Sequence, residues 1–473
     1  MLVVLAGIMG IKTSIFVADK VKDLGERRAF LRDTIAALHL QQAVNFPSVA
    51  SEDDSLSGLG AIDSLVEFLT FTYPEVFTAT EWQIIGGHSL LMRWKGSGNQ
   101  APVLFYAHMD VVPIEENSQH AWRFKPFGES HKNDTIFGRG TIDDKAGVIG
   151  ILEAASRLIK KGHQPKRDIY LAFGHDEETG GKNGAARLAG HLEKNGIKVE
   201  WLLDEGGMIA ENMVPFVQPP VALIMTAEKG FMSVELTAEG NGGHSSFPPK
   251  ETPMDIMIAG LDRLHESPFE RRAIPALEGF MDHTGPEMKF PFNMLFANRW
   301  LFRPVILSEY EKIPEANAMI RTTMACTIMK GGVKDNVLPS HVSATLNFRI
   351  LPGETSSDIL EALKQKLADD RISIRVKGRA DEPSLVSSTE SNGFKEISES
   401  VRAVFPDVIV APSLSIAATD SRHFSKVAKD IYRFLPVRMN RDLLSGMHGA
   451  NERISVDAFT ETVQFYSTLL EKQ

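Results

Sequence analysis

The amino-acid sequence predicts an α/β fold, in which a mostly parallel sheet covered by helices is interrupted by a smaller α+β domain. The chain has 473 residues, which is longer than a domain with a single hydrophobic core usually is. In its first half, unbroken apolar runs alternate with helical patterns, as in a parallel sheet buried on both faces. We therefore expect a main domain in two segments, 1–228 and 379–473, with an inserted domain at 229–378.

The main sheet is predicted from three apolar runs that lack polar alternation. They are Val103–Ala107, Ile169–Phe173 and Trp201–Leu203, and each ends just before acidic or histidine residues. Helical patterns at Ala146–Lys160 and Gly184–Asn195 separate them. Strands joined through helices run parallel, and ligands bind beyond the carboxyl ends of such strands. All of these acidic and histidine motifs should therefore lie at one edge of the sheet.

The inserted domain is predicted from a change in pattern after residue 228, where strands begin to alternate apolar and polar residues. Its order β-α-β-β-α-β is typical of a ferredoxin-like unit. The expected elements are strands at Phe231–Glu239, Thr323–Met329, Val342–Ile350 and Ile372–Val376, with helices at Asp255–Leu264 and Ser357–Leu367.

Composition narrows the function classes. The net charge is −10 with no basic block, which argues against a nucleic-acid partner. The single cysteine, Cys326, excludes an internal disulfide and a thiolate zinc cluster. A metal in this protein must therefore be held by His, Asp and Glu.

The N-terminus leaves the compartment open. Residues 1–11 are apolar and Lys12 interrupts them, whereas a membrane-spanning helix needs about 20 apolar residues. The segment also lacks the basic start of a secretory signal. A buried N-terminal segment and the remainder of a clipped membrane anchor are both consistent with this pattern.

Five acidic or histidine motifs are the strongest functional signal. Each follows or neighbours a predicted strand, so distant parts of the chain deliver metal ligands to one pocket. An isolated Asp-Asp or Glu-Glu pair is usually a solvated turn, and the inference depends on the whole set. The motifs are His108-Met-Asp110, Asp143-Asp144, Glu177-Glu178, Asp204-Glu205 and His448.

Such a set is what a two-metal hydrolase needs. Two cations about 3.5–4 Å apart can polarise a carbonyl and hold a hydroxide ready to attack it. Zinc lowers the pKa of bound water to about 7, and an unligated carboxylate nearby can move the proton to the leaving group. Asp110, two residues after His108, is placed to orient the imidazole through its second nitrogen.

The order of these motifs resembles the di-zinc metallopeptidase family of aminoacylases, carboxypeptidase S and glutamate carboxypeptidase. The likeness covers nearly the whole chain and is greatest for the branch of carboxypeptidase S and the N-acyl amino acid hydrolases and synthases. The matching segments are Ala107–Pro113, Gly138–Lys145, Gly174–Glu178, Asp204–Gly207, Gly243–Ser246, Asn336–Pro339 and His448–Glu452.

The resemblance implies a phosphorylase/hydrolase-like catalytic domain with two zinc ions per subunit, or other divalent cations in their place. It also implies a cis peptide bond between Asp143 and Asp144. The implied roles are Asp143 as bridge, His108 and Asp204 on one metal, Glu178 and His448 on the other, Glu177 as general base and Asp110 as the group that orients His108.

For the inserted domain, the resemblance implies a lid that also forms a homodimer interface. His244 would reach the neighbouring subunit's site to stabilise the oxyanion, and Asn336 with Arg349 would receive the substrate's free carboxylate. From the residues alone, His244 could instead be a histidine in a Gly-rich turn and Arg349 a solvated strand residue. An aromatic segment between His265 and Thr322 either walls an acyl-chain pocket or thickens the core, the commoner case.

We therefore expect an enzyme that hydrolyses the amide bond of N-acyl amino acids, reversibly, and releases an amino acid with a free carboxylate. A carboxypeptidase or dipeptidase acting on short peptides is the alternative within the same class. A scaffold protein that keeps the fold without metal is the alternative of a different class, and the complete ligand set argues against it.

Overall fold

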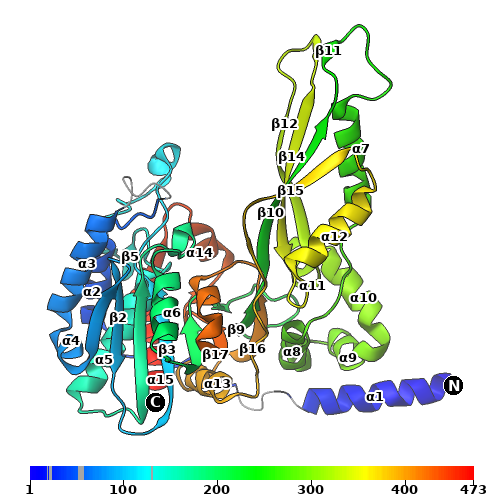
Figure 1. The fold of residues 1–473 in the computed structure, drawn as a ribbon. Helices are drawn as coiled ribbons and strands as arrows, with labels where there is room; N and C mark the ends of the chain where they lie inside the picture. The colour runs from blue at the N-terminus through cyan, green and yellow to red at the C-terminus, as the bar shows by residue number, and fades with distance from the viewer. Residues whose placement is uncertain (19, 21–23, 52–57, 129–130) are drawn as a thin grey trace.

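Two β-sheets in separate parts of the molecule organise the chain (Figure 1). The computed structural model describes residues 1–18, 20, 24–51, 58–128 and 131–473. The larger sheet lies in a body formed from both segments of the predicted catalytic domain. The smaller sheet lies in an arm that extends from this body. The α/β class and the mostly parallel sheet expected from the sequence are confirmed.

The catalytic sheet has ten strands in the order β1-β2-β6-β3-β7-β17-β9-β8-β18, with β16 pairing to β9. Its centre, β6-β3-β7-β17, is parallel, and antiparallel strands lie toward its edges. The strands are β1 Glu81–Ile85, β2 Ser89–Trp94, β3 Gln100–His108, β6 Arg167–Gly174, β7 Val199–Asp204, β8 Met208–Ala210, β9 Val221–Glu228, β16 Ile409–Ser415, β17 Ala428–Arg433 and β18 Arg438–Met439.

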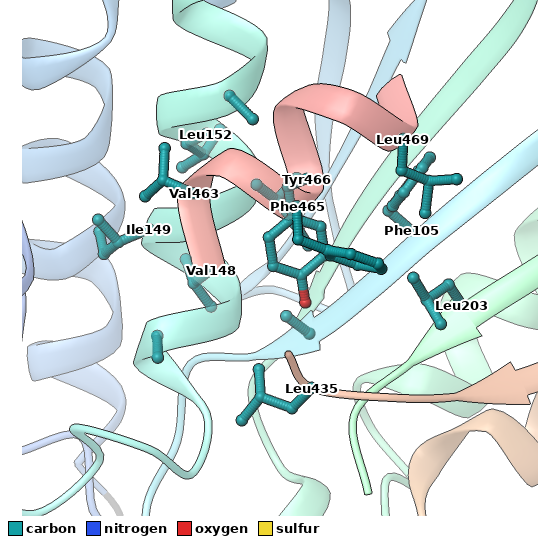
Figure 2. Packing of buried hydrophobic residues seen from close by; sticks show 14 of the residues in the cluster. Phe105, Val148, Ile149, Leu152, Leu203, Leu435, Val463, Phe465, Tyr466 and Leu469 are labelled. Atoms are coloured by element: carbon teal, nitrogen blue, oxygen red, sulfur yellow. The ribbon is translucent and has the colours of Figure 1, made fainter. Parts of the chain in front are cut away.

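Helices cover both faces of this sheet because successive residues of its central strands point to opposite sides. On β3, Phe105 packs into the core beneath α5 (Lys145–Lys160) and α15 (Val456–Glu471), as Figure 2 shows. Its neighbour Tyr106 packs into the core on the opposite face, with α6 (Ala185–Lys194). Burial on both faces explains the unbroken apolar runs of the sequence.

Shorter elements complete the body. The pairing of β5 with β19 is the one that matters for the site, because it brings the last segment of the chain beside the loop that precedes Asp143. These elements are α2 Thr34–Val44, α3 Leu59–Thr72, α4 Pro74–Ala79, α13 Asn392–Val404, α14 Arg441–Gly446, the 3-10 helices η2 Glu116–Ala121, η3 Glu177–Thr179 and η5 Asp420–Lys426, and the strands β4 His131–Lys132, β5 Thr135–Phe137 and β19 Arg453–Ser455.

The arm is an antiparallel sheet in the order β12-β14-β10-β15, with two helices packed on one face. Along the chain, its four strands and two packed helices follow the β-α-β-β-α-β order that the sequence predicts. The last strand runs to Asp381, three residues beyond the expected boundary at 378. The elements are β10 Gly230–Glu239, α7 Pro253–Glu266, β12 Thr323–Gly331, β14 His341–Ile350, α12 Ser356–Leu367 and β15 Ile372–Asp381, with β11 Gly243–His244 and β13 Val337–Leu338 paired at the tip.

The aromatic segment of the insertion packs against the catalytic sheet. Phe280 and Phe296 are buried in a core that also contains Ile409 and Ala411 of β16 and Val221 of β9. The segment therefore thickens a core at these positions, and helix α8 lies against β16 below the arm (Figure 1). Its helices are α8 Pro275–Thr284, η4 Gly285–Glu287, α9 Phe292–Ala297, α10 Arg299–Glu311 and α11 Pro314–Ile320.

The N-terminal helix α1 (Leu2–Ala18) lies along the outside of this helical segment (Figure 1). The side-chain amide of Asn298 donates to the Thr13 hydroxyl at 3.1 Å, and Phe16 packs near Gly285. Most other apolar side chains of α1 are exposed. Across the described residues, no helix combines the length and apolarity that a membrane crossing requires.

Candidate metal centre

Asp143 lies between two histidines that come from opposite ends of the chain. The Nε2 atom of His108, the last residue of β3, is 2.9 Å from Asp143 Oδ1. The Nε2 atom of His448, in the loop after α14, is 2.9 Å from Asp143 Oδ2. The peptide bond between Asp143 and Asp144 is cis, as the resemblance implies. Each oxygen of one carboxylate thus faces a different imidazole, which is the arrangement of a bridging ligand.

The adjacent glutamates extend this cluster from the turn η3, which follows β6. An oxygen of Glu178 is 3.5 Å from His448 Nε2. Ligand atoms of Asp143, Glu178 and His448 lie within 4.8 Å of one another, as do those of His108, Glu177 and Glu178. The two groups share Glu178, so the described residues bring together five of the positions that the motifs single out.

Asp110 fixes the turn and the first histidine together. Its carboxylate accepts the backbone N–H groups of Glu177 at 3.2 Å and Glu178 at 3.0 Å. Its Oδ1 atom also lies 3.4 Å from His108 Nδ1, and its backbone oxygen lies 3.0 Å from the same nitrogen. A histidine held through its second nitrogen keeps one ring orientation and one tautomer. Asp110 therefore has the contacts needed to orient His108.

Asp204 is buried at the end of β7 but lies outside both groups. Its carboxylate accepts the backbone N–H groups of Glu205 at 2.9 Å and Ser421 at 3.0 Å. These bonds hold the side chain at the sheet edge beside the cluster. Its place as a metal ligand stays a prediction.

The electrostatics show why this cluster needs a cation. Burial raises the pKa of Glu177, Asp144 and Glu205, and the neighbouring carboxylates raise it further. His448 has its pKa raised to about 10 by hydrogen bonds with Asp143 and Glu178. Burial alone would raise the pKa of Asp143, but hydrogen bonds from the two histidines lower it overall. Crowding of buried carboxylates is unfavourable for their charged forms, and a bound cation would offset it.

The donor set fits a metal in its chemistry as well as its charge. Imidazole nitrogens and carboxylate oxygens are the ligands that zinc accepts where thiolates are absent. Glu178 Oε1 and Asp144 Oδ2 are buried and have no hydrogen-bond partner among the residues that the structure describes. Buried polar atoms normally have partners, so an unmatched carboxylate oxygen in this cluster is consistent with a ligand for a cation.

Sequence reasoning missed Glu452, which organises the loop that carries Asp143. Its buried carboxylate accepts the backbone N–H groups of Gly140, Ile142 and Asp143 at 3.1, 2.8 and 3.2 Å, and the Arg139 guanidinium at 2.8 Å. Arg139 also donates to the Gly449 carbonyl at 3.0 Å, beside His448. Glu452 is the last residue of the matching segment His448–Glu452, so the sequence did point to it. Its role could not be predicted, because the backbone N–H groups that it binds leave no pattern in a sequence.

The three site residues expected from the inserted domain do not meet in one chain. His244 and Asn336 lie together at the tip, where the Ser245 N–H donates to the Asn336 carbonyl at 3.2 Å. Arg349 lies at the base, where β14 pairs with Phe231 of β10. The strand β10 has 10 residues, which span roughly 30 Å. Within one chain, Asn336 and Arg349 therefore lie at opposite ends of the arm. The tip of the arm lies far from the catalytic body (Figure 1).

Comparison with known proteins agrees with the geometry of this centre. Peptidase family M20/M25/M40 matches residues 104–472, which include all five members of the cluster. The chain belongs to the M20 peptidase family. It is 36% identical over 441 residues to the N-fatty-acyl-amino acid synthase/hydrolase PM20D1 of Xenopus tropicalis, covering 91% of this chain and 84% of that protein. It is 37% identical over 409 residues to the probable carboxypeptidase S-like 2 of Dictyostelium discoideum, covering 86% and 78%.

Solved M20 structures share the fold. The M20 family metallo-carboxypeptidase Sso-CP2 from Sulfolobus solfataricus superposes with a TM-score of 0.66 at 21% identity, covering 92% of this chain and 98% of that one. The Bacillus subtilis YXEP protein, a dinuclear metal-binding peptidase of the M20 family, gives 0.56 at 14% identity, covering 93% and 97%. The expected family and branch are confirmed, and this M20 chain is a metal-dependent hydrolase.

We expect Glu452→Gln to weaken metal binding by about 10–100-fold, because groups that orient metal ligands typically contribute that much. The glutamine side chain would place an NH2 group against backbone N–H donors that now face a carboxylate oxygen of Glu452. The measurement is a competition titration of the zinc-loaded protein with a chromogenic chelator. Glu390→Gln, at an exposed glutamate, is the matched control, and equal metal affinity in both variants would contradict the assigned role.

Proposed function

We propose that this chain is a two-zinc amidohydrolase that cleaves N-acyl amino acids and releases an amino acid with a free carboxylate. The observation that carries the proposal is Asp143 lying between His108 and His448, with Glu178 beside them. The likeness to an N-fatty-acyl-amino acid synthase/hydrolase supports the substrate class. The same site would also catalyse the reverse condensation, because a catalyst lowers the barrier in both directions.

Glu177 is the proposed general base and acid. Zinc ions held by His108, Asp143, Glu178, Asp204 and His448 would supply a water of lowered pKa and polarise the scissile carbonyl. Burial raises the pKa of Glu177, a shift in the direction that favours proton transfer by a carboxyl group. Glu177 takes the proton from the attacking water and delivers it to the nitrogen of the leaving amino acid.

Arg349 is the proposed receptor for the substrate's carboxylate. Its guanidinium is partly buried, and burial lowers its pKa, as does the charge of Arg379. No carboxylate forms an ion pair with it in the part of the chain that the structure describes. A half-buried cation that lacks an anionic partner is costly, and an arginine fork matches carboxylate geometry. These facts favour a substrate with an unblocked carboxyl group.

His244 and Asn336 are proposed to act on the site of a second copy of the chain. They lie at the exposed tip, remote from the cluster of their own chain. The strand β12 is at the edge of the arm's sheet and pairs only with β14 among the described strands. An open edge can pair with another copy. A homodimer through the arm would let each tip reach the other chain's zinc site, where His244 would stabilise the oxyanion.

A carboxypeptidase or dipeptidase activity is the second candidate. It is favoured by the likeness to a probable carboxypeptidase S-like protein and uses the same site, because a peptide's last residue also carries a free carboxylate. The two candidates differ in what lies on the acyl side of the scissile bond.

A substrate series separates these candidates. The purified protein is assayed with N-acyl phenylalanines of graded chain length, with dipeptides ending in phenylalanine, and with the carboxamide form of each. We expect the acyl compounds to be hydrolysed with the higher kcat/KM, and blocking the carboxyl group to lower kcat/KM at least tenfold. Faster cleavage of dipeptides would favour the peptidase, and hydrolysis of neither set would overturn the proposed function.

Mixing two inactive variants tests the second-copy proposal. Glu177→Gln should retain metal and lose turnover, and His244→Ala should lose turnover in a homodimer. A mixed dimer would contain one intact zinc site facing one intact His244, so activity should return on subunit exchange, up to about half of the wild-type rate per mixed dimer. His265→Ala, at a solvent-facing histidine of α7, is the control. Mixtures that remain inactive, despite exchange shown by differently tagged chains, would contradict a shared site.

A further inference from the structure

The carbonyl of Gly180 is a meeting point between the arm and the catalytic turn. It accepts hydrogen bonds from Arg379 Nη1 at 3.4 Å, from Arg422 Nη2 at 2.8 Å and from His423 Nε2 at 3.1 Å. Arg422 and His423 belong to η5 of the body, whereas Arg379 comes from β15 of the arm. One backbone oxygen therefore joins two parts of the molecule that otherwise have separate cores.

Gly180 is also the residue that closes the turn carrying the general base. Its N–H donates to the Glu177 carbonyl at 2.7 Å, and its φ of 99° is a left-handed conformation that glycine adopts without strain. A Cβ atom at this position would lie 2.2 Å from Arg379 Nη1. The guanidinium therefore packs directly against the backbone of the turn, where a displacement of Arg379 would change the contact with Gly180.

Arg379 is linked on its other side to the proposed carboxylate receptor. Its guanidinium lies 6.0 Å from the ring centre of Phe231, and Arg349 lies 5.0 Å from the same ring. Asp381 holds Arg379 through an ion pair of 2.8 Å. The two arginines repel each other enough for Arg379 to contribute to the lowered pKa of Arg349. An anion bound at Arg349 would remove much of that repulsion.

We propose that Arg379 is a positioning residue, which couples occupation of the carboxylate site at Arg349 to the Glu177–Gly180 turn. A substrate carboxylate at Arg349 relieves the repulsion across Phe231 and strengthens the long 3.4 Å hydrogen bond from Arg379 to the Gly180 carbonyl, so the turn that carries the base is held most firmly when a free carboxyl group is present. The inference rests on the proposed function for the location of that carboxylate. It makes the carboxylate contribute to turnover as well as to binding.

The first test separates kcat from KM with a pair of substrates, N-acetylphenylalanine and its carboxamide. In the wild-type protein, replacing the carboxylate should lower kcat about tenfold in addition to raising KM. In Arg379→Gln that loss in kcat should shrink to about twofold or less. Arg375→Gln, at an exposed arginine of the same strand that pairs with Glu235, should behave as the wild type. An Arg379→Gln variant that loses the same factor with both substrates would show a merely structural contact and overturn the proposal.

The second test does not depend on turnover. Hydrogen exchange of the peptide covering 177–184 is followed in the zinc-loaded Glu177→Gln protein, with and without N-acetylphenylalanine. Exchange should slow about fivefold on binding and should not slow when Arg379→Gln is added, whereas Arg375→Gln should leave the protection intact. Protection that persists in the Arg379→Gln protein, or none in its parent, would overturn the coupling. If the wild-type protein did not hydrolyse N-acetylphenylalanine, but the compound still slowed exchange in the Glu177→Gln protein, only the proposed function would be contradicted.

Discussion

Buried negative charge at the carboxyl ends of the central strands is the constraint on which the rest of this structure depends. Asp143, Asp144, Glu177 and Glu205 all lie at one edge of the sheet, and burial disfavours the charged form of each carboxylate. Two imidazoles alone cannot satisfy so many oxygens, and Glu178 Oε1 has no hydrogen-bond partner in the described part of the chain. Divalent cations solve this problem directly, because they supply concentrated positive charge where hydrogen-bond donors are too few.

The surrounding structure holds the acidic residues of the cluster in place against their mutual repulsion. Glu452 gathers the N–H groups of the loop before Asp143, and Asp110 gathers those of the turn that carries Glu177 and Glu178. Both are carboxylates that accept several backbone donors, an arrangement that stabilises an ionised acid inside a protein. The loop before Asp143 and the turn of Glu177 and Glu178 are therefore each held by backbone hydrogen bonds to a buried carboxylate.

Periodicity in the sequence was sufficient to predict the fold class and the strand ends, whereas the choice of residues for the cluster rested on the motifs and on the resemblance to a family. Unbroken apolar runs indicated buried parallel strands, so the ends of β3, β6 and β7 could be placed at one edge. The separation of Asn336 from Arg349 could not be predicted in this way, because it depends on the length of the arm and on where its hairpins turn. The packing of Phe280 and Phe296 in one core with β16 could not be predicted either, because an apolar pattern does not indicate which element it packs against.

The measurement that tests the central claim most directly is the metal content of the purified chain, followed through chelation. Element analysis should find two zinc ions per chain. Amide hydrolysis should disappear as a chelator removes them and return when zinc is restored. Full hydrolysis by protein shown to contain no divalent metal would contradict a site built from Asp143 and its two histidines.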